Sequence, residues 1–204
     1  MNLIAVTHGA VDCPDDLCVG QTEMALSDAG FTAVQRLAAS WSGPSPRFLF
    51  SSDLRQARQS AQVFAAQLAS EPLFEPRLRE IDFGEWQGRN WTQVAREDRK
   101  RYGHWLANPV IQAAPGGESF TDLLRRSGAW LASLLSTTRH GDTVLAVTHV
   151  GTLRALLCHT LGLTPARSRS VMAAPAAASL IRCHDGQFEV CYLNATQFQD
   201  THNA

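Results

Sequence analysis

Two histidines, His8 and His149, each follow a short apolar run, and each is followed by a glycine within two residues. The runs "LIAV" and "VLAV" lead to them through Thr7 and Thr148. Imidazole is the side chain best suited to proton transfer or nucleophilic attack near neutral pH. A single histidine of this kind is more often structural, but two in equivalent positions favour one shared site. The adjacent glycines would let a ligand approach the backbone closely.

Short apolar runs alternate with longer amphipathic segments along the chain. We expect strands over 2–7, 47–51, 143–148, 178–183 and 188–193. We expect helices over 28–41, 53–69, 118–136 and 151–161, where apolar residues recur at helical spacing. This alternation predicts a three-layer α/β/α fold with a mostly parallel sheet. The stretch "HDGQ" contains an Asp-Gly turn and predicts a final hairpin, which makes one edge of the sheet antiparallel.

Ligands of parallel α/β sheets bind where strands end and helices begin. Helices that start near Asp53 and after Gly151 would present free N–H groups to an anion at such an edge. Residues 83–117 fit the alternation poorly and contain three tryptophans. We interpret them as a partly helical excursion that covers the site within a single domain, 1–204. A surface loop without a function is the alternative.

Composition excludes several classes of partner. The chain has 204 residues and a net charge of −1, which does not favour a nucleic acid or an anionic membrane surface. It has no secretory signal pattern, and no apolar run approaches the roughly 18–20 residues that span a bilayer. The five cysteines form no CxxC pair, so we expect reduced thiols in a cytoplasmic protein. A metal site built from the two histidines and Cys13 or Cys18 is a weaker alternative, because the spacing does not support it.

Six segments, in order, carry a family resemblance. They are "LIAVTHGA", "VGQTEMALSDAG", "FSSDLRQARQSA", "LREIDFGEWQG", "PGGESF" and "AVTHVGTLRAL". Together they resemble the histidine phosphatase superfamily, with its phosphoglycerate mutase-like fold, from residue 3 to about 163. The spacing within 17–30 is most similar to the alpha-ribazole phosphatase-type branch.

The resemblance implies a phosphomonoesterase that works through a phosphohistidine, without a metal or another cofactor. His8 would be the nucleophile, and His149 would stabilise the charge of the transferring phosphoryl group. Glu80 would act as a general acid and then as a general base. Without the resemblance, Glu80 would be interpreted as a solvated charge beside Arg79.

The chain departs from the family pattern at two positions where an arginine normally holds the phosphoryl oxygens. Thr7 precedes the first histidine, and Gln56 stands in the "SSDLRQA" segment. Threonine and glutamine donate hydrogen bonds but supply none of the charge of a guanidinium group. Arg55 is adjacent to Gln56 but points about 100° away on a helix. Arg154 matches another arginine position of the family and is expected to support the fold near the site.

Two functions stay open. The first is an atypical phosphomonoesterase, and the alternative is a catalytically impaired pseudo-phosphatase that acts as an anion-binding or regulatory module. Either would bind a small phosphate ester or another anion, and a homodimer stays open as the assembly. The excursion would recognise the organic half of a ligand with Trp86, Arg89, Trp91 and Trp105, or these residues would only pack. The residues predicted to bind phosphate or substrate are Thr7, Gly9, Gln21, Thr22, Arg55, Gln56 and Gly151.

Overall fold

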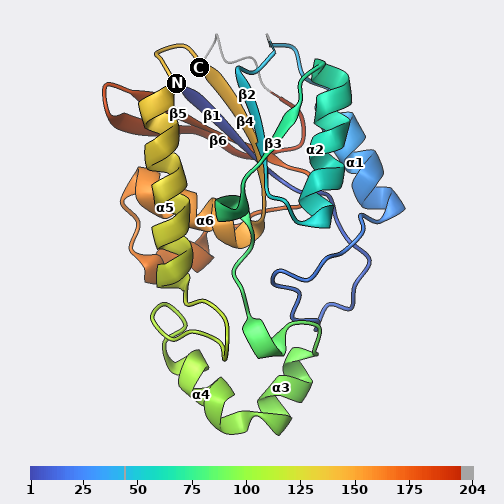
Figure 1. Ribbon diagram of the computed structural model, residues 1–204, viewed down its shortest axis with the longest axis vertical. Helices are drawn as coiled ribbons and strands as arrows, with labels where there is room; N and C mark the ends of the chain where they lie inside the picture. Colours follow the sequence, from blue (N-terminus) through green and yellow to red (C-terminus); the bar gives the residue numbers. More distant parts are fainter. Residues whose placement is uncertain (44, 199–204) are drawn as a thin grey trace.

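The computed structural model describes residues 1–43 and 45–198. Its six-stranded sheet has the order β3-β2-β4-β1-β5-β6 (Figure 1). The strands are β1 (Asn2–Thr7), β2 (Phe48–Ser51), β3 (Pro72–Phe74), β4 (Thr143–Thr148), β5 (Ala178–His184) and β6 (Gln187–Ala195). The first four strands pair in parallel, whereas β5 and β6 are antiparallel to their neighbours. This confirms the predicted mostly parallel sheet with an antiparallel edge.

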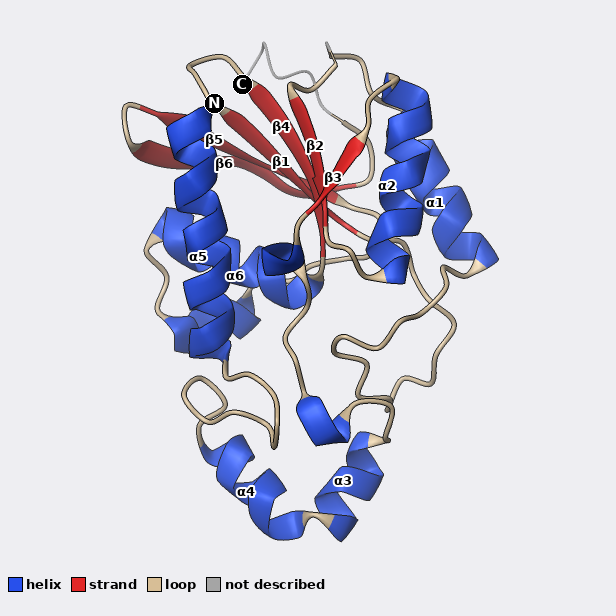
Figure 2. Cartoon of the chain, in the orientation of Figure 1, coloured by secondary structure: helices blue, strands red, loops and turns tan. Residues whose placement is uncertain are grey.

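Helices cover both faces of the sheet, as predicted (Figure 2). The helices of the two outer layers are α1 (Asp28–Ala39), α2 (Arg55–Leu68), α5 (Phe120–Thr137) and α6 (Val150–Leu161). On β1, Ile4 and Val6 pack in the core shared with α1 and α2. Leu3 and Ala5 pack in the core shared with α5 and α6. Because both faces of the central strands are buried, these strands are continuous apolar runs rather than alternating patterns.

The final hairpin agrees with the sequence prediction, whereas the edge strand β3 was not predicted. Asp185 and Gly186 adopt positive φ angles of 49° and 76° and form the predicted turn between β5 and β6. β3 is not among the predicted strands, because it has only three residues and begins with Pro72. An edge position accommodates the missing N–H of proline.

The start of α2 differs from its predicted position. The expected helix begins at 53, but the observed one begins at Arg55 after the cap residue Leu54. Asp53 instead accepts a hydrogen bond from Nε of Arg79 at 2.7 Å. This pair connects the end of β2 to the segment that precedes Glu80.

The excursion, residues 83–117, lies beyond the carboxyl ends of the parallel strands (Figure 1). It contains η2 (Gly84–Trp86), α3 (Trp91–Glu97) and α4 (Arg99–Ala107). Trp86 is fully buried, and its Nε1 donates to Asp98 at 2.8 Å. Arg89 pairs with Glu97. Both Trp86 and Arg89 therefore stabilise the excursion itself. The apolar cluster of the excursion consists of Cys18, Phe83, Trp86, Trp91, Val94, Tyr102, Trp105 and Ala114.

The cysteines of the chain are reduced. All five cysteines are free thiols, and burial raises the pKa of Cys18 to about 12. A thiol with such a pKa stays protonated and unreactive near neutral pH.

Within residues 1–43 and 45–198, every helix is too short or too polar to cross a membrane.

Replacing Phe64 with Ala should lower the free energy of unfolding by about 3–5 kcal/mol, because the ring is completely buried between α2 and the sheet. Phe31→Ala is the control: this ring on α1 is 42% exposed, and its loss should cost less than about 1 kcal/mol. Urea unfolding followed by tryptophan fluorescence measures both changes. Equal losses would contradict the assignment of the core.

Candidate active site

His8 and His149 lie side by side because β1 and β4 pair in parallel and in equal register. Thr7 lies opposite Thr148, and the backbone N–H of His8 donates to the carbonyl of Thr148 at 3.0 Å. The two rings meet edge to face, with centroids 4.9 Å apart and planes inclined by 65°. The structure thus brings together the two histidines that end equivalent strands.

One nitrogen of the His8 ring has a partner, and this contact determines where the proton lies. Nδ1 lies 2.7 Å from the carbonyl oxygen of Gly9. Because a carbonyl oxygen only accepts hydrogen bonds, Nδ1 carries the proton of the neutral ring and Nε2 keeps its lone pair. Burial lowers the pKa of His8 more than the Gly9 contact raises it. The ring is therefore neutral near pH 7, with Nε2 available as a nucleophile.

His149 is the cap residue of α6, and it is only 1% exposed. Its Nε2 lies 2.8 Å from the hydroxyl oxygen of Ser52, which follows β2. Burial, and then the neighbouring His8, lower the pKa of His149 well below its usual 6.5. An anion bound beside the rings would oppose this effect, because a nearby negative charge favours the imidazolium form. The pair can therefore gain positive charge when an anion arrives.

Glu80 holds its carboxylate against the start of α6. One oxygen accepts the backbone N–H of Gly151 at 2.9 Å, and the other accepts that of Ile81 at 2.8 Å. A Cβ on Gly151 would lie 2.1 Å from Oε1 of Glu80, so only glycine permits this approach. Burial raises the pKa of Glu80 more than its two backbone hydrogen bonds lower it. A carboxyl group with a raised pKa is suited to proton transfer.

Arg126 of α5 fixes the segment that carries Glu80. Its guanidinium donates to the carbonyls of Arg77, Arg79 and Glu80 at 2.7–2.9 Å. It also forms a bidentate pair with Glu118, at 2.8 and 2.9 Å. The planar fork of arginine is suited to several such contacts at once. Arg126 is therefore a positioning residue for the carboxyl group of Glu80.

A cleft of about 390 Å³ exposes these side chains, and we call it the histidine cleft. It contains His8, Glu80 and His149, with Gln56 and Gly151 beside them. Phe83 and Trp91 of the excursion and Arg154 of α6 also line it. Five of the residues predicted for the site therefore line one cavity, and the excursion supplies part of its wall.

Thr7 and Gln56, at the two expected arginine positions, are hydrogen-bonded to the backbone. Thr7 is buried, and its hydroxyl donates to the carbonyl of Ala174. The amide of Gln56 donates to the carbonyl of Thr22 at 3.3 Å and accepts the N–H of Met24 at 3.2 Å. Neither residue brings a positive charge to the cleft.

The remaining predicted ligand-binding residues do not line the cleft. Gly9 donates its N–H to Ser60, and a Cβ there would lie 2.6 Å from the carbonyl oxygen of Gly30. Gln21 donates its side-chain amide to the carbonyl of Glu80 at 3.0 Å. Thr22 contributes the carbonyl that receives Gln56. Arg55 is exposed. These placements make Gly9, Gln21 and Thr22 part of the frame around the site.

Ser52 and Arg126 are parts of the site that the sequence pattern does not indicate. Ser52 was one of two adjacent serines, with no pattern that pointed to His149. Arg126 is one of two adjacent arginines, 46 residues after Glu80, and no sequence pattern indicates its contact with that segment. Arg154 supports the fold through a hydrogen bond from Nε to the carbonyl of Val171 at 3.0 Å. It also faces the histidine cleft, a role that we did not expect.

Over residues 1–43 and 45–198, no cluster of three or more His, Cys, Asp or Glu side chains could hold a metal ion. Cys13 and Cys18, the cysteines of the weaker metal alternative, are both absent from the lining of the histidine cleft. The alternative metal site therefore has no ligand set in the described part of the chain.

Replacing Gly151 with Ala should displace the carboxylate of Glu80 and lower the free energy of unfolding by about 1–3 kcal/mol. The reason is the 2.1 Å approach of the new Cβ to Oε1. A crystal structure of the variant and its urea unfolding measure the two effects.

Gly103→Ala is the matched control, because this glycine of α4 has no atom within 4 Å of a new Cβ. The change should stabilise the helix by roughly 0.5–1 kcal/mol. An unmoved Glu80 carboxylate and unchanged stability in the Gly151 variant would contradict the proposed packing.

The chain is similar in sequence and in fold to known phosphatases. The adenosylcobalamin/alpha-ribazole phosphatase of Escherichia coli K12 is 28% identical over 164 residues, or 80% of each chain. The crystal structure of a putative alpha-ribazole-5'-P phosphatase from the same organism has a TM-score of 0.91 at 23% identity, covering 98% of both chains. A mycobacterial glucosyl-3-phosphoglycerate phosphatase in complex with inorganic phosphate has a TM-score of 0.83 at 25% identity. It covers 97% of this chain and 99% of that one.

The family match covers nearly the whole chain. Residues 3–196 match the histidine phosphatase superfamily (branch 1). This range includes His8, Glu80 and His149. The fold has the phosphoglycerate mutase-like arrangement that the six sequence segments predict. The chain belongs to the histidine phosphatase superfamily, branch 1.

Proposed function

We propose that the protein is a phosphomonoesterase that forms a phosphohistidine at His8. The observation that carries this proposal is the state of His8: its Nδ1 is held by the Gly9 carbonyl, which leaves Nε2 unprotonated in a cleft that also contains Glu80. Family membership supports the same chemistry. The substrate is a small phosphate monoester.

In the first step, Nε2 of His8 attacks phosphorus and the bond from phosphorus to the ester oxygen breaks. Glu80, whose pKa is raised by burial, gives its proton to the leaving alkoxide. The ring of phosphorylated His8 carries a positive charge, and its Nδ1–H donates to the Gly9 carbonyl. The alcohol leaves and the phosphoryl group stays on the histidine.

In the second step, the carboxylate of Glu80 takes a proton from water as the oxygen attacks phosphorus. The bond between phosphorus and Nε2 breaks, and its electron pair returns to the ring. Inorganic phosphate leaves, and both His8 and Glu80 regain their starting protonation. His149 stabilises the phosphoryl oxygens in both steps, with charge induced by the bound anion.

A second candidate function is an anion-binding module that does not turn over. The observation that favours it is the engagement of Thr7 and Gln56 with the backbone, which leaves both arginine positions without charge. An arginine that stabilises a transferring phosphoryl group can contribute roughly 10³–10⁵ in rate. Phosphatase activity therefore requires that another part of the cleft supply positive charge to stabilise the transferring phosphoryl group.

Wild-type protein mixed with phenyl phosphate should form an adduct on His8 that is stable in alkali and lost in acid. Formation of the adduct requires attack on phosphorus by Nε2 of His8. The His8→Ala variant should therefore form no adduct, and its hydrolysis rate should fall to background. Peptide mass spectrometry after an alkaline quench locates the phosphoryl group.

His104→Ala, at an exposed position on α4, is the control and should keep both adduct and turnover. Absence of an adduct and of hydrolysis for a panel of phosphate esters would refute the phosphatase proposal. Retained binding of those esters would then favour the anion-binding module.

The pH dependence of kcat/KM should be bell-shaped. His8 must be neutral, and its lowered pKa puts the acidic limb below pH 6.5. Glu80 must be protonated, and its raised pKa puts the alkaline limb above pH 4.5. Activity should therefore rise as His8 loses its proton and fall as Glu80 loses its own.

Glu80→Gln should remove the alkaline limb and lower kcat/KM for an alkyl phosphate by about 10²–10⁴-fold. The loss should be much smaller for 4-nitrophenyl phosphate, whose leaving group needs no proton. Initial rates for both esters across pH measure this difference. Equal losses for the two esters would show that Glu80 does not protonate the leaving group.

A further inference from the structure

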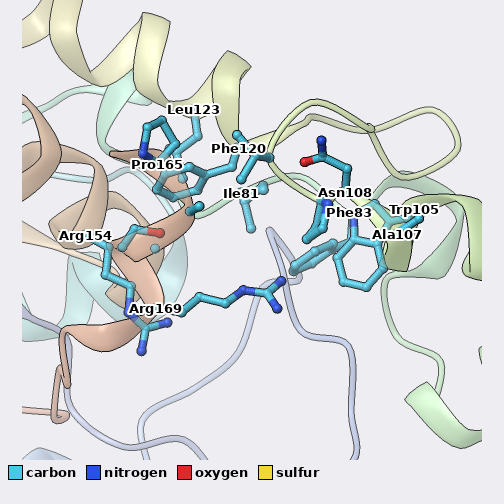
Figure 3. A pocket seen from close by; sticks show the side chains of 15 residues that line it. Ile81, Phe83, Trp105, Ala107, Asn108, Phe120, Leu123, Arg154, Pro165 and Arg169 are labelled. Atoms are coloured by element: carbon cyan, nitrogen blue, oxygen red, sulfur yellow. The ribbon is translucent and has the colours of Figure 1, made fainter. Parts of the chain in front are cut away.

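A second cavity of about 400 Å³ opens beside the histidine cleft (Figure 3). The two cavities share four lining residues, among them Gly151 and Arg154. A ligand with its phosphoryl group at His8 can therefore extend into the second cavity, whose volume suits a small organic molecule. We call it the arginine pocket, after Arg154 and Arg169 in its wall.

The walls of the arginine pocket differ in chemistry. Phe83, Trp105 and Asn108 of the excursion lie on one side, and the two arginines lie across from them (Figure 3). Arg154 comes from α6, and Arg169 comes from η3 (Pro165–Ser170). Most of the remaining lining is apolar. Such a pocket suits a ligand with a flat or apolar body and a polar group at one end.

Neither Arg154 nor Arg169 forms an ion pair with a carboxylate among the described residues, although Glu80 lies close enough to Arg154 for a Coulombic interaction. Arg154 is partly buried and held by the carbonyl of Val171, whereas Arg169 is exposed. By contrast, Arg79, Arg101 and Arg126 all pair with carboxylates nearby. Two unpaired guanidinium groups in one pocket wall attract an oxyanion.

The indole of Trp105, which lines the same pocket, has no hydrogen-bond partner among the described residues. Trp105 is 8% exposed, and its Nε1 is buried without a hydrogen-bond partner in the described structure. An indole N–H only donates, and burial of a donor without an acceptor is unfavourable. Because Nε1 is shielded from the cavity, Trp105 contributes the surface of its ring to the pocket wall and not this donor.

We propose that the arginine pocket binds the leaving-group half of the substrate, and that Arg154 and Arg169 hold an oxyanion, a carboxylate or a second phosphate, on that half. The inference rests on the proposed phosphatase function and specifies its substrate class as anionic phosphate monoesters. It also identifies a source of positive charge in a site whose two expected arginine positions hold Thr7 and Gln56. Arg154 lies in both cavities and so contacts the phosphoryl end as well.

The test compares three aryl phosphates that share one ring: phenyl phosphate, 4-carboxyphenyl phosphate and 1,4-phenylene bisphosphate. Wild-type kcat/KM should be about tenfold to a hundredfold higher for an ester with the second anion, as expected for charge-assisted hydrogen bonds. The carboxylate and phosphate esters separate the two oxyanion sources. Equal values for all three esters would overturn the proposal.

Arg169→Gln should reduce this preference to nearly one, and Arg169→Lys should keep part of it. Arg167→Gln is the matched control, because Arg167 is an exposed arginine of η3 outside the pocket lining, and the preference should persist. A preference that survives in Arg169→Gln, or that disappears equally in both glutamine variants, would overturn the assignment.

A binding measurement separates failure of this inference from failure of the phosphatase proposal. Calorimetric titration of the His8→Ala variant with the same esters requires no turnover. Tighter binding of the doubly anionic esters, lost in His8→Ala/Arg169→Gln, would support the arginine pocket even if no ester were hydrolysed. Equal binding of all three esters would refute the pocket even if the enzyme were active.

Discussion

The parallel pairing of β1 with β4 is the constraint on which the site depends. Equal register places Thr7 opposite Thr148, so the residue after each strand is a histidine at the same edge of the sheet. A shift by one residue would turn every side chain of a strand to the other face and separate the rings. The apolar runs that prevent this shift are buried on both sides, between two pairs of helices. The packing of the core therefore fixes the geometry of the two imidazoles.

Burial of the site has a second consequence, because it shifts the pKa of each of the three titratable groups in the direction that favours its neutral form. His8 and His149 have lowered pKa values, and Glu80 has a raised one, with desolvation as the main cause in each case. Neutral imidazoles can attack or respond to an arriving anion, and a neutral carboxyl group can donate a proton. Positive charge beside this centre comes from Arg154 in the wall of the cleft, whereas Arg126 behind Glu80 is paired with Glu118.

Most of the fold could be predicted because its central strands and covering helices have strong periodic signals. The exceptions have local causes: β3 has only three residues, and α2 begins two residues later than expected, since Asp53 pairs with Arg79. Within the site, His8, Glu80, His149 and Gly151 could be identified from motifs in the printed sequence, and the structure places them around one cleft. The directions of Thr7 and Gln56 could not be predicted, because hydrogen bonds to distant backbone groups decide them.

By itself, the sequence determined the alternation of strands and helices, the family motifs and the two positions that lack arginine. These are properties of residue type and spacing along the chain. Only the tertiary structure decided that Arg126 holds the Glu80 segment, that Ser52 contacts His149, and that Arg154 and Arg169 share a pocket wall with no carboxylate within ion-pair distance among the described residues. The first two contacts join elements far apart in the chain, and the shared wall brings together the consecutive elements α6 and η3. These arrangements arise when α5, α6 and η3 pack around the sheet, and the local sequence does not indicate how the three elements pack.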